Sequence, residues 1–349
     1  MNNVYQSLIE KKKNDRKEFQ IFLFKKCNIS CSFCFFTKEQ LKDSTGIDTI
    51  IFQAFTLIDE IKRIEKTQIT TKKYQLNIMG GELFSDDIDD KYFNDYFEYC
   101  KMIQKELSNL DIKFVFVTNL IYKKYKRVIE LYSKLKREGL DIHLGTSYDF
   151  KGRFNKANLE VFNENLLNNF PFEILNNVSV VLTKQNIRAF IENKDMHFRE
   201  YYHKGYSLYF DYFSPTDSTK NSQAHIPSDI DIYNFLTFAK ENYPNIYPVK
   251  DFIENDINSM TCRQSLTLKS DQSNCSNCRN LTCGSNDFEY EENHSKVENS
   301  DIENAFLKKY NCLSCEYFNK CGLGCFLQDS YKIKEKVDYC VYKRFFSEF

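Results

Sequence analysis

The residue types and segments that are absent from the sequence narrow the class of protein to which it can belong. The chain of 349 residues has no tryptophan, only five histidines and no long apolar run. Its longest apolar stretches, such as 21–24 and 114–117, have the length of strands and fall far short of the roughly 18 residues that a membrane span needs. Residues 1–17 are polar and lysine-rich, and they lack the apolar core of a signal peptide. We therefore expect a soluble, cytoplasmic protein with no membrane partner.

Neither sign of charge is in excess. The chain carries 48 basic and 49 acidic side chains, with a formal net charge of −1. Nucleic-acid binding depends on clustered Lys and Arg. The basic runs Lys11–Lys13 and Lys123–Lys126 are short and typical of solvated helix faces. We therefore expect no nucleic-acid partner.

Cysteine, in contrast, is abundant. The chain has 13 cysteines, and most of them lie within 262–349. The cytoplasm keeps thiols reduced, so disulfides would not explain this number. Ligation of a metal or a metal cluster is the better interpretation.

The first two-thirds of the chain alternates between short strand-like runs and segments of helical period. Ile51, Phe55, Ile58 and Ile61, for example, recur at three- and four-residue spacing. Such alternation predicts β-α-β units, a parallel sheet and right-handed crossovers. We expect an α/β fold, a partial (β/α)6 barrel of parallel strands, with its chemistry at the carboxyl ends of the strands. The expected strands are 19–24, 74–79, 112–117, 141–147, 177–182 and 207–212.

Three regions are expected along the chain. Residues 18–213 form the barrel, and 214–261 form a connecting helix and linker, with the helix over 230–241. Residues 262–349 form a small, loop-rich, cysteine-rich C-terminal module. This module has too little apolar sequence for a core of its own, so we expect metal clusters to hold it together.

Cys27-x-x-x-Cys31-x-x-Cys34 directly follows the first expected strand. Three thiolates in one loop can bind three irons of a [4Fe–4S] cluster and leave the fourth iron open. An open position distinguishes a reactive metal site from a structural one. The alternative is a partial zinc site, but no fourth Cys or His lies close to Cys34 in the sequence.

With the aromatic Phe33 before its last cysteine, this motif resembles the signature of the radical S-adenosylmethionine (SAM) enzymes. The resemblance implies that the open iron chelates the amino and carboxylate groups of SAM. An electron from the cluster then cleaves the sulfonium, and the resulting 5′-deoxyadenosyl radical abstracts hydrogen from the substrate. It also implies an electron donor such as a flavodoxin or ferredoxin.

The ends of the second and third strands extend the resemblance. Gly80-Gly81-Glu82 is similar to the family's GGE motif, in which the glycines allow close backbone approach to the ligand. The carboxylate of Glu82 would accept a hydrogen bond from the SAM ammonium. Asn119 lies where the family often has Thr-Asn-Gly, with Leu120 in place of the glycine.

The fourth and fifth strands end in weaker matches. Ser147 and Asp149 resemble the segment that meets the ribose and carboxylate of SAM, and Arg153 would pair with that carboxylate. The alternative is that Ser147 and Asp149 are ordinary turn residues. Leu182 resembles the family's apolar wall against adenine, with plain core packing as the equal alternative.

The C-terminal cysteines resemble the SPASM extension of radical SAM enzymes, which implies two auxiliary [4Fe–4S] clusters. A hairpin of 265–268 and 280–284, with further cysteines at its tip, would carry some of the ligands. Structural zinc with four thiolates per ion is the alternative. The resemblance assigns one cluster to Cys312, Cys315, Cys321 and Cys340, and the other to Cys262, Cys283 and Cys325 with Cys275 or Cys278. Cys278 also fits as the hairpin partner of Cys262 in place of Cys283.

The resemblance implies a substrate that is a side chain of a ribosomally made peptide or protein, modified by a crosslink or an oxidation. The first alternative is the same chemistry on a small molecule of the sugar or aminoglycoside type. The second is a non-enzymatic, zinc-stabilised binding protein. The sequence identifies no general base, although Asp211 and Tyr212 stand at the end of an expected strand.

Overall fold

The computed structural model describes most of the chain up to residue 254 and shorter parts beyond it. The described residues are 17–34, 36–67, 72–150, 152–192, 194, 196–213, 225–254, 266–268, 274–275, 307–318, 320–321 and 340–348.

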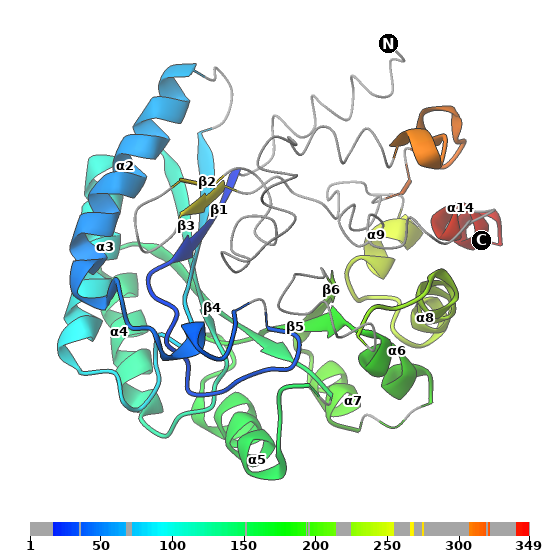
Figure 1. Ribbon diagram of the computed structural model, residues 1–349, viewed down its shortest axis with the longest axis horizontal. Coiled ribbons are helices and arrows are strands. Elements are labelled where there is room, and N and C mark those ends of the chain that lie inside the picture. The colour runs from blue at the N-terminus through cyan, green and yellow to red at the C-terminus, as the bar shows by residue number, and fades with distance from the viewer. Residues whose placement is uncertain are drawn as a thin grey trace.

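One sheet forms the centre of the molecule (Figure 1). Its six main strands follow chain order and pair in parallel with their neighbours. They are β1 Lys17–Phe22, β2 Lys73–Met79, β3 Asp111–Thr118, β4 Asp141–Tyr148, β5 Asn177–Leu182 and β6 Ser207–Tyr212. The expected α/β fold, a partial barrel of parallel strands, is confirmed. β5 and β6 have the expected bounds, and β1 begins two residues earlier than expected.

Helices connect the strands and cover the outer side of the sheet (Figure 1). They are α2 Ile50–Thr67, α3 Lys91–Glu106, α4 Tyr125–Arg137, α5 Lys156–Glu164, α6 Lys184–Ile191 and α7 Met196–His203. Short helical turns lie at η1 Gln40–Lys42, η2 Ile47–Thr49, η3 Asn165–Asn169 and η5 Cys312–Ser314. On β3, Ile112, Phe114 and Phe116 are buried in the main hydrophobic core, and the alternate residues are less buried. Period-two alternation therefore gives each strand one face toward the helices.

The opposite, concave face of the sheet carries many polar side chains. The pairing register places Gln20, Asn77 and His143 in one row across β1, β2 and β4, and Ser179 and Tyr209 in another across β5 and β6. Branched apolar residues usually fill the interior of a closed parallel barrel. The concave face is therefore suited to a polar ligand rather than to a dry core.

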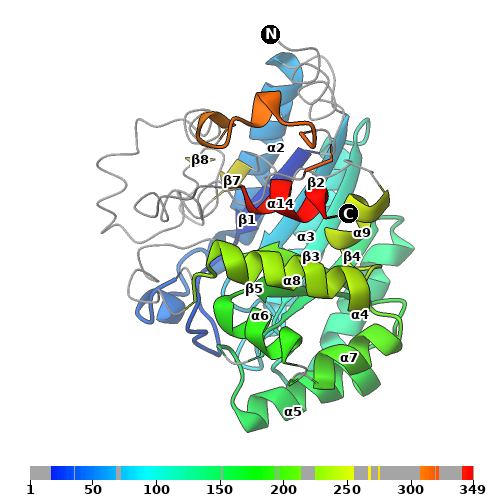
Figure 2. The same cartoon turned by 90° about the vertical axis from the view of Figure 1, so that its right-hand side faces the viewer.

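Residues beyond the barrel pack on its last strands. α8 Asp229–Asn242 begins with a capping box from Ser228 and confirms the helix expected over 230–241. α14 Val341–Ser347 lies beside α8 and near α9 Val249–Glu254 (Figure 2). The rings of Phe345 and Phe346 contact Phe252 of α9, with centroids 6.2 and 5.4 Å apart.

The C-terminal region also adds a hairpin to the sheet. β7 Leu266–Leu268 pairs in parallel with β1, and β8 Asn274–Cys275 pairs antiparallel with β7. Cys275 therefore lies in the returning strand, whereas we expected it at the hairpin tip. The expected returning strand, 280–284, lies outside the described residues, as do Cys262, Cys278, Cys283 and Cys325.

The three expected regions stay a prediction in their bounds, although β7 shows that the last of them contributes to the barrel sheet. In the part of the chain that the structure describes, no helix is both long and apolar enough to cross a membrane.

Candidate functional site

Cys27, Cys31 and Cys34 lie in the loop that follows the carboxyl end of β1. The Cys27 amide donates to the carbonyl of Leu41 at 2.9 Å, and the Cys34 amide donates to the carbonyl of Cys31 at 3.1 Å. Cys34 Sγ accepts from the Phe36 amide at 3.4 Å. A small hydrophobic cluster supports the loop from below and consists of Phe22, Phe36, Leu41 and Met79, with Val117 beside it. The loop is thus held by its own backbone and by the tops of β1, β2 and β3.

The three thiols are partly buried, and Cys31 and Cys34 both lie close enough to Cys27 for their charges to act on its thiol. The pKa of Cys27 is raised to about 12, chiefly by burial and to a smaller extent by the charges of Glu82, Cys31 and Cys34. Among the described residues, no three His, Cys, Asp or Glu side chains converge as the ligands of one metal ion would. A [4Fe–4S] cluster instead takes each thiolate on a different iron, and hydrogen bonds to sulfur tune it. Three thiols, one of which accepts a hydrogen bond from a backbone amide, fit such a cluster. Binding of the cluster would release the thiol protons.

Gly80 and Gly81 join this loop to the end of β2. The Gly81 amide donates to the carbonyl of Phe24 at 3.0 Å, and the Glu82 amide donates to that of Lys26 at 2.9 Å. A Cβ on Gly81 would lie 2.0 Å from the carbonyl oxygen of Lys26. The close approach that we expected at these glycines is made, in the structure, with the backbone just before Cys27.

The carboxylate of Glu82 is buried between the ends of β2 and β3. It accepts hydrogen bonds from the Phe84 amide at 3.1 Å, from Thr118 Oγ1 at 2.8 Å and from the Asn119 amide at 2.5 Å. Burial raises its pKa to about 7, and the hydrogen bonds oppose that rise. A buried carboxylate at this position would gain from a cationic ligand.

Asn119 links Glu82 to the cysteine loop. Its Nδ2 donates to Asn28 Oδ1 at 2.8 Å and lies 3.8 Å from Cys27 Sγ. The next residue, Leu120, has a φ of 59°, the left-handed conformation in which glycine is the usual residue. Asn165 of η3 donates to the carbonyl of Leu120 at 2.8 Å and so holds this turn. No pattern in the sequence marks Asn165, which lies 45 residues away from Leu120.

Ser147, Asp149 and Arg153 lie together at the end of β4. Asp149 accepts from the amides of Gly152 and Arg153, and Arg153 Nη1 donates to the carbonyl of Ser147. The structure therefore joins these three residues to one another, and their expected contacts with SAM stay a prediction.

This second loop covers the cysteine loop. The Ser32 amide donates to the carbonyl of Gly152 at 2.8 Å. The guanidinium of Arg153 lies 5.6 Å from the ring centroid of Phe33. Burial raises the pKa of Cys31, and the positive charge of Arg153 and its hydrogen bond to the thiol oppose that rise. Arg153 thus favours the thiolate that iron binding requires.

Leu182 is on the helix-facing side of β5. It alternates with Val178 and Val180, and all three are buried in the main hydrophobic core. This placement favours the core-packing interpretation over a wall against adenine.

Besides Cys275 of β8, the structure describes four C-terminal cysteines. Cys312 and Cys321 are buried in the main core, and Cys315 and Cys340 pack against it. Cys340 precedes α14, and the charge of Cys315 raises its pKa together with burial. Cys315 thus lies close enough to Cys340 for its charge to act on that thiol, and the assignment of all four residues to one auxiliary cluster stays a prediction. Eight of the described cysteines are free thiols: Cys27, Cys31, Cys34, Cys100, Cys312, Cys315, Cys321 and Cys340.

Sequence reasoning missed His225, which precedes α8. Its side chain is 7% exposed, and Nδ1 has no hydrogen-bond partner among the described residues. The ring lies 6.1 Å from that of Phe213. Burial lowers the pKa of His225, and the charge of Asp149 opposes this, so burial disfavours the charged imidazolium. No signal marks His225 in the sequence, because it lies in a polar stretch between two elements.

Asn186 connects the β4 loop to α6 and was also missed. Its Nδ2 donates to Asp149 Oδ2 at 2.8 Å and to the carbonyl of Val181 at 2.7 Å, and its Oδ1 accepts from the Phe150 amide at 3.0 Å.

Replacing the buried Asn186 by alanine should lower the free energy of unfolding by about 3 kcal/mol, because it leaves several buried polar groups unpaired. Urea denaturation measures this. Asn168→Ala, which removes an exposed hydrogen bond to Glu164, is the control and should cost less than about 0.5 kcal/mol. Equal losses in the two variants would contradict the expectation.

Comparisons with known proteins give structural similarity alone. No family model and no curated protein sequence matches this chain. Among solved structures, SuiB of Streptococcus suis has 18% sequence identity and a TM-score of 0.49, covering 97% of this chain and 79% of that chain. SuiB bound to S-adenosylmethionine has 15% identity and a TM-score of 0.38, covering 96% and 79%. Methylornithine synthase (PylB) has 12% identity and a TM-score of 0.39, covering 95% and 90%.

Proposed function

We propose that this chain is a radical SAM enzyme, which cleaves SAM reductively and uses the 5′-deoxyadenosyl radical to abstract hydrogen from a substrate. The observation that carries the proposal is the direct connection between the cysteine loop and Glu82. The Glu82 amide donates to the carbonyl of Lys26, next to Cys27, and Asn119 contacts both Glu82 and the vicinity of Cys27. Three thiols and a buried carboxylate thus lie on adjacent loops at the carboxyl ends of parallel strands, where such barrels place their chemistry.

The residues of this chain would divide the work of binding SAM. Cys27, Cys31 and Cys34 would hold the [4Fe–4S] cluster, which supplies the electron that cleaves the sulfonium of SAM. Glu82 would accept from the SAM ammonium, because a carboxylate excluded from water binds a cation more strongly than an exposed one does. Ser147, Asp149 and Arg153 would contact the ribose and the carboxylate from the opposite loop.

Anaerobic incubation of the iron-loaded protein with SAM and dithionite tests this function. We expect 5′-deoxyadenosine from the wild type and none from Cys31→Ser, which should also bind about four fewer iron atoms. Cys100→Ala is the matched control, since Cys100 is a buried thiol on α3 in the core and should not affect either readout. A wild type that forms no 5′-deoxyadenosine, or a colourless preparation loaded with zinc, would contradict the proposal.

We further propose that the C-terminal cysteines hold auxiliary clusters. Cys312, Cys315, Cys321 and Cys340 would ligate one of them, and the proximity of Cys315 to Cys340 supports this for two of the four. A second would use Cys262, Cys275, Cys278, Cys283 and Cys325, of which four are needed. We expect Cys315→Ser to lower the iron content by about four atoms and to leave a SAM-perturbed cluster signal in electron paramagnetic resonance. An unchanged iron content would contradict this assignment.

The proposed substrate is a side chain of a peptide or protein, with a flavodoxin or ferredoxin as electron donor. The resemblance of the C-terminal cysteines to the SPASM pattern supports this class. On the polar concave face, the buried Oε1 of Gln20 has no hydrogen-bond partner among the described residues, and it would accept from an amide group of such a ligand. Incubation with short peptides encoded beside the gene, followed by mass spectrometry for loss of hydrogen, tests it.

A further inference from the structure

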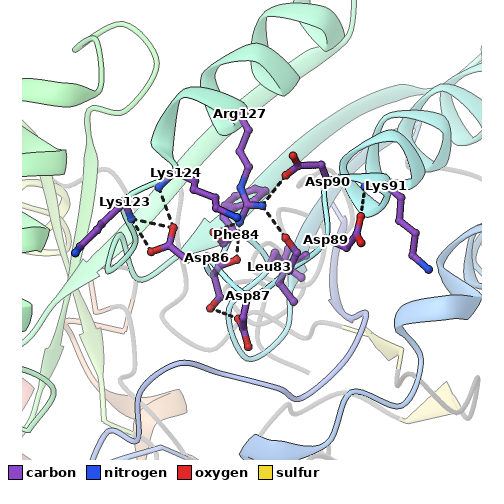
Figure 3. A network of polar contacts seen from close by, with 12 residues as sticks. Leu83, Phe84, Asp86, Asp87, Asp89, Asp90, Lys91, Lys123, Lys124 and Arg127 are labelled. Carbon is purple, nitrogen blue, oxygen red and sulfur yellow. Dashed lines mark hydrogen bonds and ion pairs between the residues drawn. The ribbon is translucent and has the colours of Figure 1, made fainter.

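Arg127 of α4 holds the loop that follows Glu82 (Figure 3). Its Nη1 donates to the carbonyl of Ile88 at 2.6 Å and to Asp90 Oδ1 at 2.9 Å. Its Nη2 donates to the carbonyls of Phe84 at 3.1 Å and Ser85 at 2.5 Å. One side chain therefore fixes the backbone of this loop at three carbonyls.

The packing of Arg127 also restricts its position. The guanidinium lies 4.4 Å from the ring centroid of Phe93 on α3, and the side chain is 11% exposed. A planar, buried guanidinium with several acceptors is a rigid contact, and lysine cannot reproduce its fork.

Asp86 makes the reciprocal connection from the loop to the turn before α4 (Figure 3). Its carboxylate accepts from the amide of Lys123 at 3.0 Å and from that of Lys124 at 2.8 Å. The loop after β2 and the turn after β3 are thus joined in both directions.

The other acidic residues of this loop have separate partners. Asp87 pairs with Lys26 at 2.6 Å, and Asp89 accepts from the Lys91 amide at 2.9 Å. Each of the four aspartates of this loop, Asp86, Asp87, Asp89 and Asp90, therefore binds a different group of the protein.

Glu82 lies between the two joined segments. From the β2 side, the amide of Phe84 donates to Glu82, and the carbonyl of the same residue accepts from Arg127. From the β3 side, Thr118 and Asn119 donate to Glu82. Movement of Phe84 relative to β3 would therefore move the Glu82 carboxylate or break one of its hydrogen bonds.

We propose that Arg127 is a positioning residue that sets the place of the Glu82 carboxylate for the SAM ammonium; this rests on the function proposed above. Arg127 does not touch SAM and acts through Phe84 and Glu82. Charge-assisted contacts depend steeply on geometry, so a displaced carboxylate binds the ammonium less tightly.

The SAM dissociation constant of the iron-loaded protein, measured anaerobically by calorimetry, tests the inference. We expect Arg127→Met to weaken SAM binding about tenfold and Arg127→Lys to lie between it and the wild type. Iron content should be unchanged, because the contacts of Arg127 with described residues all lie outside the cysteine loop. Arg63→Met is the matched control: Arg63 is an exposed arginine on α2 that pairs with Glu60, and its loss should leave SAM binding unaltered.

A double-mutant cycle with Glu82→Gln separates positioning from a general effect on the fold. If Arg127 acts through Glu82, Arg127→Met should have little further effect on SAM binding in the Glu82→Gln background. Hydrogen exchange of the Asn119 amide, which donates to Glu82, should accelerate in Arg127→Met beyond the change at other buried amides.

Failure of the role of Arg127 and failure of the proposed function give different results. Additive effects of the two substitutions, or an unchanged Asn119 amide, would overturn the role of Arg127 while leaving the proposed function intact. A wild type that binds no SAM would refute the proposed function. In that case the Asn119 amide alone would still decide whether Arg127 positions Glu82.

Discussion

Replacing Gly81 by alanine is expected to abolish loading of the N-terminal cluster. A Cβ at this position would lie 2.0 Å from the carbonyl oxygen of Lys26 and 2.3 Å from that of Lys25. These are backbone atoms directly before Cys27, so they cannot move aside as the end of a flexible side chain would. The chain must separate the two loops, which breaks the hydrogen bonds from Gly81 to Phe24 and from Glu82 to Lys26. We expect a loss of about 3 kcal/mol or more in unfolding free energy.

The measurements are iron content after anaerobic reconstitution and denaturant unfolding of the metal-free protein. Gly145→Ala is the matched control, because a Cβ there meets nothing closer than Val115 Cγ1 at 3.8 Å, an ordinary contact. It should load iron like the wild type. Full iron loading of Gly81→Ala would show that the two loops need not touch in the working protein.

The barrel was predictable because its signals are local. Strands such as 177–182 and helices such as 230–241 show their period within one segment, and the structure has them at β5 and α8. The pairing of β7 with β1 was not predictable. β7 has three residues, and its partner lies more than 200 residues earlier, so no local pattern records the contact.

The residues of the candidate site were likewise predictable only where a local motif marks them. The motif residues Cys27, Gly81, Glu82 and Asn119 were predicted, and the structure brings them together. The residues that hold them, such as Arg127, Asn165 and Asn186, were not. Each has a partner far away along the chain: Asp149 lies 37 residues from Asn186, Leu120 lies 45 residues from Asn165, and Phe84 lies 43 residues from Arg127. Arginine and asparagine at such places look like ordinary helix residues in a single sequence.

The buried carboxylate of Glu82 is expected to make the stability of the metal-free protein depend on pH. Burial raises its pKa from 4.5 to about 7, so the folded state disfavours the charged form. A raised carboxyl pKa means that the contribution to stability is fully present below pH 4.5 and is lost as pH rises toward 7. The unfolding free energy should therefore fall by about 3 kcal/mol across this interval from Glu82 alone. Denaturant unfolding between pH 5 and 8 measures the slope, and a wild type whose slope equals that of Glu82→Gln would contradict the expectation.

The substitution Glu82→Gln should reduce the pH dependence of the unfolding free energy and at the same time weaken SAM binding. The substitution keeps the shape and removes the buried charge, so the variant should lose less stability than the wild type as pH rises from 5 to 8. It should nevertheless bind SAM about 100-fold more weakly at pH 8, because a neutral amide replaces a carboxylate facing an ammonium. Thr118→Val is the matched control: it removes one hydrogen bond to Glu82 and leaves the charge in place, so it should weaken SAM binding far less. The contrary outcome is a Glu82→Gln variant whose unfolding free energy depends less on pH than that of the wild type but which binds SAM with wild-type affinity. That result would mean that the Glu82 charge serves another ligand and that a different residue contacts the SAM ammonium.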